Sequence, residues 1–192
     1  DGPLLLAADW RVQDSQGRVT LRREAGDVWP SGQSARPLRL EQAQVQLSLA
    51  PQRWEVQAQL RSAHLGRLDA NGDWRPAANG LPNSQSPLRL AVNADAPDLA
   101  AWATWLPPGM RVGGRLAANV SLEGSLAAPR WRGALKGEAL ALSRPADGLA
   151  LENGQLRASL QDELVKLDAL SLRDRQGGEL NLSGQANWRR PD

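Results

Sequence analysis

Residues 110–126 read MRVGGRLAANVSLEGSL, and this stretch decides the fold. Its even positions are all apolar or glycine, whereas its odd positions are charged, polar or small. A helix would scatter these residues around its circumference, but a β-strand places alternate residues on opposite faces. The pattern therefore predicts a long β-strand with one apolar face.

The same alternation recurs along most of the chain, separated by turn signals rich in Gly, Pro, Asn and Asp. In four places the apolar phase slips by one residue: near Glu41, after Gly137, at Asn153-Gly154 and after Leu167. A β-bulge produces such a slip, so we expect bulges there. The alternating segments are 4–12, 19–21, 38–49, 54–60, 68–74, 88–92, 131–142, 149–160, 165–172 and 180–188.

One short helix is expected over residues 98–106. Pro97-Asp98 is a helix-start signal, and Pro107-Pro108-Gly109 ends the helix just before the strand that begins at residue 110. We expect the helix to cover part of the sheet with four apolar residues at helical spacing, Leu99, Trp102, Trp105 and Leu106.

Composition limits the function classes. The net charge is only +2, lysine occurs only at 136 and 166, and the arginines are dispersed, so nucleic-acid binding is not expected. The absence of cysteine excludes a disulfide framework. No apolar run approaches the ~20 residues of a membrane-spanning helix. Because the sequence begins within the alternating pattern and ends just after a strand-like segment, we expect it to be a piece of a longer protein.

About ten amphipathic strands share one apolar face, and a single helix of ~10 Å diameter shields two or three strands at most. A closed barrel, a two-sheet sandwich or a folded sheet that stays open would each hide the face. The slips and in-strand glycines favour strong bending. We therefore expect an all-β fold: a long curved, mostly antiparallel sheet folded into an open, taco-like apolar groove. An ordinary sandwich core is the alternative.

The order of motifs resembles the C-terminal region of TamB-like proteins, members of the AsmA-like superfamily. The resemblance is firm from about Leu88 to Trp188 and weaker before it. The motifs that carry it are the short helix, Leu106-Pro-Pro-Gly109, Val112-x-Gly-Arg-Leu116, Val120-Ser-Leu-Glu-Gly-Ser-Leu-Ala-Ala-Pro129, Trp131-x-Gly133, Leu149-x-Leu-x-Asn-Gly-x-Leu156 and Gly177-Gly-x-Leu-x-Leu-x-Gly184.

The resemblance implies a periplasmic segment of a bridge that is anchored in the inner membrane of a Gram-negative bacterium. It implies transport of phospholipid between the inner and outer membranes along an apolar interior, and a TamA-like partner, a barrel of the BamA family. Assistance in the assembly of outer-membrane proteins, including autotransporters, is the second role that it implies. We expect residues 1–87 to form an N-terminal β-meander and 88–192 to form the TamB-like segment, as one continuous unit.

Acyl chains are expected to lie against the apolar phase of the strands, at positions with small or aliphatic side chains. The predicted lining residues are Val112, Leu116, Ala118, Val120, Leu122, Leu135, Leu156, Ala158, Leu160, Leu167, Leu170, Leu172, Leu180, Leu182, Ala186 and Trp188.

No catalytic, metal or cofactor site is predicted. His64 is the only histidine, and no phosphate-binding or HExxH motif occurs. The acids at 162, 163 and 168 lie near hairpin turns, where carboxylates are usually solvated. Two alternatives to a lipid groove stay open: a scaffold that pairs its sheet edges with strands of barrel proteins, and a segment of an outer-membrane barrel.

Overall fold

The chain forms strands wherever apolar and polar residues alternate. The computed structural model describes residues 4–13, 16–28, 37–78 and 80–187, which form strands and two short 3₁₀ helices. The strands are β1 (Leu5–Gln13), β2 (Gln16–Ala25), β3 (Leu40–Ala50), β4 (Arg53–Ser62), β5 (Gly66–Trp74), β6 (Leu88–Ala96), β7 (Arg111–Gly124), β8 (Pro129–Arg144), β9 (Leu149–Gln161), β10 (Leu164–Asp174) and β11 (Glu179–Asn187).

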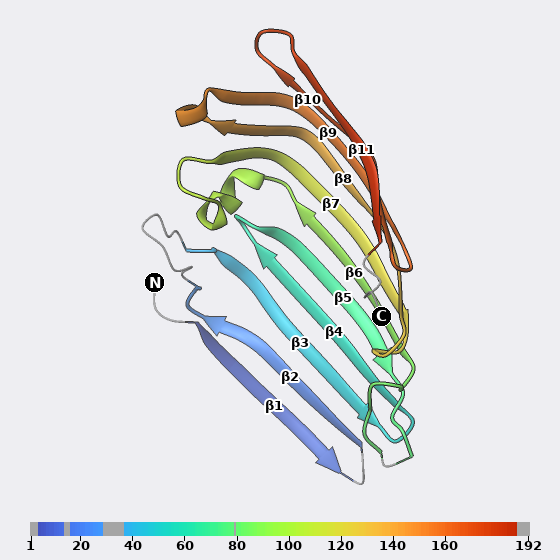
Figure 1. Ribbon diagram of the computed structural model, residues 1–192. Helices are drawn as coiled ribbons and strands as arrows, with labels where there is room; N and C mark the ends of the chain where they lie inside the picture. The colour runs from blue at the N-terminus through green and yellow to red at the C-terminus, as the bar shows by residue number, and fades with distance from the viewer. Residues whose placement is uncertain (1–3, 14–15, 29–36, 79, 188–192) are drawn as a thin grey trace.

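Strands that follow one another in the sequence are neighbours in space. They form one 11-stranded sheet in the order β1 to β11, and every neighbouring pair is antiparallel (Figure 1). Short connections suit this arrangement, because a tight turn can join only antiparallel neighbours. The predicted all-β fold with a long, curved, antiparallel open sheet is confirmed.

The four predicted phase slips are bulges or register irregularities. The pairing of β3 with β4 shifts between Leu40 and Gln42. In β8 the register shifts between Gly137 and Leu140, where Ala139 has a φ of 50°. Asn153 in β9 has a φ of 54°, and β10 shifts after Leu167.

The irregularities of β7 to β10 lie beside one another and bend these strands. Figure 1 shows β8 to β10 bending along their length, whereas β1 runs nearly straight. Gly114, with a φ of 101°, adds a further irregularity in β7 opposite the one in β8. Bulges increase local twist and bending, so their alignment across neighbouring strands makes a crease in the sheet.

The predicted helix is present as the 3₁₀ helix η1 (Leu99–Trp105), which is shorter than expected. The Asp98 carboxylate accepts a hydrogen bond from the Ala100 amide at 2.9 Å and caps its start. At its end, the Leu106 amide donates to the Ala103 carbonyl at 3.1 Å. Pro107 and Pro108 have no amide proton to continue the ladder, so the segment stays short and tight. The second 3₁₀ helix, η2 (Pro145–Asp147), joins β8 to β9.

The sheet is a single layer with little interior. The chain exposes 13225 Å², whereas a compact monomer of its mass would expose about 8,900 Å². Among the described residues, only four hydrophobic side chains are buried: Leu40, Ala96, Leu122 and Leu172. No helix within the described ranges is both long and apolar enough to cross a membrane.

Candidate functional site: the apolar face

The register places one apolar row across every strand of the sheet. Directly opposed residues in an antiparallel sheet share a face, so the pairings can be followed from strand to strand. At a strand spacing of about 4.8 Å, this row is about 48 Å long. From β1 to β11 its members are Ala8, Leu21, Val45, Ala58, Ala70, Val92, Val120, Gly133, Leu160, Val165 and Ala186.

Further apolar rows flank the first and complete what we call the apolar face. One runs from β3 to β11: Ala43, Leu60, Leu68, Ala94, Ala118, Leu135, Ala158, Leu167 and Gly184. Another runs from β6 to β11: Ala96, Leu116, Gly137, Leu156, Leu170 and Leu182. A third runs from β1 to β8: Trp10, Val19, Leu47, Val56, Gly72, Leu90, Leu122 and Trp131.

The apolar face is largely open. Among the described residues, the main contacts between elements join neighbouring strands, with η1 packing on β7 and η2 on β9. Trp10 is 71% exposed and Leu182 is 47% exposed, and these two residues lie at opposite edges of the sheet. An exposed apolar surface of this extent marks an interaction site.

The predicted lining residues lie together as the alternation required. Twelve of those within the described ranges lie in the rows of the apolar face, on β7 to β11, and one of them, Leu122, is buried between its neighbours. The other three lie outside these rows: Val112 pairs with Leu142, and Leu180 pairs with the buried Leu172. Trp188 lies outside the described residues. The sequence-based selection omitted the equivalent positions of β1 to β6, such as Val45 and Val92. Their alternation was visible, but their membership of the same rows depends on the register.

The helix η1, which lies between β6 and β7 in the chain, carries a pair of tryptophans. A 3₁₀ helix has three residues per turn, so Leu99, Trp102 and Trp105 align on one side. The two indole rings are 5.5 Å apart with a 58° angle between their planes. Trp102 and Trp105 remain 41% and 50% exposed, respectively. The predicted role of η1 as a cover over the sheet stays a prediction.

The opposite face of the sheet is polar and organised by ion pairs. Arg53 contacts both Glu55 and Asp73 at 3.2 Å, and Arg115 pairs with Glu138 across β7 and β8. Such exposed pairs contribute about 0–1 kcal/mol each, so they favour the register more than they stabilise the fold.

Of the acids near the β9–β10 turn, Asp168 has a structural explanation. Lys166 lies 3.0 Å from the Asp168 carboxylate. The hydrogen bond from Lys166 lowers the pKa of Asp168, with a smaller contribution from the Ser159 hydroxyl, against slight burial that raises it. No group of three metal-ligating side chains occurs within the described part of the chain.

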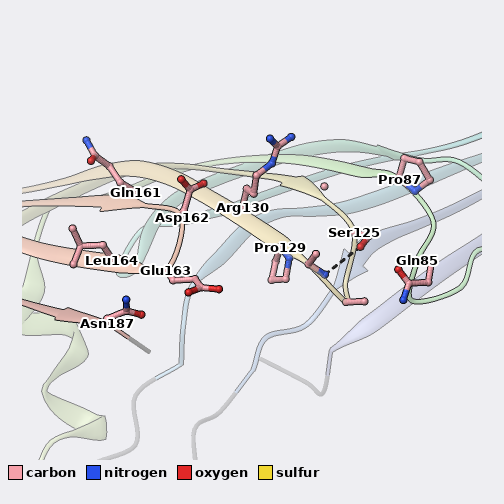
Figure 2. Close-up of a pocket in the computed structure, with 13 residues that line it drawn as sticks. Gln85, Pro87, Ser125, Pro129, Arg130, Gln161, Asp162, Glu163, Leu164 and Asn187 are labelled. Carbon is pink, nitrogen blue, oxygen red and sulfur yellow. Dashed lines mark hydrogen bonds between the residues drawn. The ribbon is translucent and has the colours of Figure 1, made fainter. Parts of the chain in front are cut away.

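A cavity of about 900 Å³ lies at one end of the apolar face (Figure 2). It is bounded by the loop before β6, the β7–β8 and β9–β10 turns, and the end of β11. About 24 Å would separate β6 from β11 in a flat sheet, so their joint contribution to one cavity reflects the curvature. Its lining residues are Gln85, Pro87, Gly124, Ser125, Ala127, Ala128, Pro129, Arg130, Gln161, Asp162, Glu163, Leu164 and Asn187. Sequence patterns gave no signal for it, because it is assembled from separate turns.

A family model described as TamB, N-terminal domain, matches residues 4–137. The chain belongs to the TamB family. Neither curated proteins nor solved structures gave a match. The match includes the first five strands, where the motif resemblance was weaker. It is to the N-terminal domain of TamB, so the predicted assignment to the C-terminal region of the family is not supported, while the family itself is confirmed.

Proposed function

We propose that the apolar face binds the acyl chains of phospholipids, as one stretch of a TamB-like bridge between the inner and outer membranes. The observation that carries this proposal is the open apolar row that crosses all eleven strands without a polar residue. Acyl chains need a dry aliphatic surface and no specific polar partners, and the rows offer that surface.

The energetics suit transport as well as binding. Each buried CH₂ group contributes about 0.8 kcal/mol, so part of one chain gains several kcal/mol. Successive strands present similar side chains at steps of about 4.8 Å, so a chain that moves across the strands meets nearly equivalent sites. Because these sites bind the chain with similar free energy, the chain can slide along them without being held tightly at any one position.

Membership of the TamB family supports the cellular setting of the proposal. It implies a periplasmic location, an anchor in the inner membrane elsewhere in the protein, and a TamA-like barrel of the BamA family as partner. No catalytic step is proposed, because movement along the apolar face requires only binding and release.

Site-specific photocrosslinking tests the proposal in the full-length protein in cells. Val120 lies in the central apolar row, and its sequence neighbour Asn119 is exposed on the polar face. We expect labelled phospholipid to be captured by a probe at Val120 and not by a probe at Asn119. If the probe at Val120 crosslinks only to the protein itself, the apolar face is an ordinary packed core, and the proposal loses its basis.

Assembly of outer-membrane proteins is the second candidate function, favoured by the open edges of the sheet. Strands β1 and β11 each have one sheet neighbour among the described residues. Their free edges can pair with an extended client strand. A proline placed in an edge strand would then abolish client binding, whereas charges on the apolar face would not. The lipid proposal predicts the reverse.

A further inference from the structure

The tryptophans lie toward the ends of the strands and are absent from the middle of the apolar face. The rows that contain Val120 and Ala118 consist only of aliphatic residues and glycine. Every tryptophan within the described ranges lies near a strand end: Trp10, Trp54, Trp74, Trp102, Trp105 and Trp131. The apolar face is therefore aliphatic in its middle, and its aromatic residues are at its borders.

Four tryptophans form one border, which we call the tryptophan rim: Trp10, Trp54, Trp74 and Trp131. Trp54 and Trp74 oppose each other across β4 and β5, and Leu88 continues their row on β6. Trp10 and Trp131 belong to the adjacent row, on β1 and β8. Because neighbouring strands are antiparallel, the ends of β1 and β5 and the starts of β4 and β8 meet at this border.

The helix η1 lies at the opposite ends of the strands, between the end of β6 and the start of β7 (Figure 1). It packs on β7 and carries the two exposed tryptophans, Trp102 and Trp105. No charged residue occurs from 99 to 110, which includes η1 and the turn after it. This border therefore also offers indole rings without a competing charge of its own.

The distance between the two borders matches the apolar thickness of a lipid bilayer. Val112 to Leu122 on β7 spans about 33 Å along an extended strand. The hydrocarbon core of a bilayer is about 30 Å thick, and tryptophans of membrane proteins gather where hydrocarbon meets the headgroups. Two phospholipids whose chain ends face each other would therefore fit between the tryptophan rim and η1.

The alternative orientation, with acyl chains across the strands, is unfavourable for the polar end of the lipid. The central row continues without a polar residue for about 48 Å. A lipid that lies across the strands would place its ester groups and headgroup against aliphatic side chains. Polar groups without hydrogen-bond partners in such surroundings cost free energy.

We propose that the acyl chains of bound phospholipids lie parallel to the strands, with the ester groups at the tryptophan rim or at η1 and the headgroups outside the apolar face. The inference rests on the proposed function and adds the orientation of the lipid. An indole ring packs against the first carbons of an acyl chain, and its N–H group donates to an ester or phosphodiester oxygen. Movement from strand to strand then carries the chains sideways, while the headgroups follow the borders through water.

Position-dependent fluorescence quenching tests this orientation. A fluorescent amino acid is placed in the full-length protein at Leu88, in the row of Trp54 and Trp74, or at Val92, in the central row of the same strand. The purified protein is loaded with phospholipid that carries a nitroxide either next to the ester or at the chain end. We expect the nitroxide next to the ester to quench more strongly at Leu88, and the nitroxide at the chain end to quench more strongly at Val92. This comparison leaves every tryptophan in place.

The role of the tryptophan rim is tested by Trp54→Leu combined with Trp74→Leu. This variant should lose the preference for the nitroxide next to the ester at Leu88, whereas Trp102→Leu, at the opposite border, is the matched control and should keep it. A preference that the double variant retains would overturn the role of the tryptophan rim. Equal quenching by the two nitroxides at both positions would overturn the orientation and leave acyl-chain binding standing. Absence of quenching by either nitroxide at Val92 would overturn acyl-chain binding and the orientation together.

Discussion

Gly114 of β7 packs against the backbone of Ala139 in β8 so closely that a Cβ atom on the glycine would lie 2.6 Å from the Ala139 carbonyl oxygen. Both residues have positive φ angles, 101° and 50°. Asn153 in β9 continues the irregularity with a φ of 54°. This contact fixes the crease that bends β7 to β10 and gives the apolar face its curvature.

Substitution of Gly114 should damage this crease. Gly114→Ala adds a Cβ atom that overlaps the Ala139 and Glu138 carbonyls, at a φ that L side chains rarely adopt. We expect a loss of about 1–3 kcal/mol in the free energy of unfolding. The matched control is Gly113→Ala, because its Cβ would meet the Ala141 Cβ at an ordinary 3.6 Å. Urea unfolding followed by circular dichroism measures both variants. Equal stabilities would show that the Gly114 contact does not hold the crease.

Asp27 should make the junction of β2 and β3 sensitive to acid. Its carboxylate accepts hydrogen bonds from the amides of Val28 at 2.8 Å, Arg39 at 2.7 Å and Leu40 at 3.3 Å. Burial raises the pKa of Asp27, but these hydrogen bonds and the charge of Arg23 together outweigh it, so the pKa is lowered overall.

A lowered folded-state pKa contributes stability that is present above the unfolded pKa of about 3.9 and is lost as the pH falls through the folded value. Asp27→Asn should therefore be less stable than the wild type at neutral pH, and the difference should shrink below about pH 4. Thermal unfolding at several pH values measures this. A difference that is constant from neutral pH to pH 3 would contradict the role of the charged carboxylate.

Ser62 should stabilise the β4–β5 turn through its buried hydroxyl. The hydroxyl donates to the Leu38 carbonyl and accepts from the Leu65 amide at 2.9 Å and the His64 amide at 3.2 Å. Ser62→Ala leaves these groups without a partner, and each unsatisfied buried group costs about 1–3 kcal/mol. We expect a clear decrease in the unfolding midpoint, whereas Ser84→Ala, at an exposed loop position, should have little effect. Equal midpoints would exclude the hydroxyl as a stabilising group.

Most of the sheet could be predicted from the sequence, because alternation and phase slips are local signals. The slips near Glu41, Gly137 and Asn153 located irregularities that the structure contains. The irregularity at Gly114 gave no such signal, since the extra residue of that bulge is Ala139 in the partner strand. The conformation of η1 was not predicted either, because a helix of two turns leaves little periodicity to measure.

The candidate site was predictable only in part. Alternation identifies which residues share a face of their own strand, so the apolar lining of β7 to β11 was found. The cavity at Gln85 and Asp162, and the contacts of Asp27 with residues 39 and 40, join segments distant in sequence, for which a single sequence has no signal. The expected division of the chain into an N-terminal β-meander, residues 1–87, and a second segment, residues 88–192, stays a prediction.

A charge on the apolar face should block lipid movement without unfolding the sheet. Val120 belongs to the central row, and Leu182 lies at the exposed β11 edge, so an arginine at either position can extend toward solvent. We expect Val120→Arg and Leu182→Arg to reduce strongly the capture of phospholipid by a probe at Val92, which pairs with Val120 in the same row of the full-length protein. An acyl chain gains nothing beside a charged group and must pass each strand in turn. Asn119→Arg on the polar face is the control and should leave capture unchanged. Circular dichroism and protease resistance verify that each variant is folded. Undiminished lipid capture in both folded apolar-face variants would exclude movement along this face, and loss of client binding in edge-strand variants would then favour the assembly role.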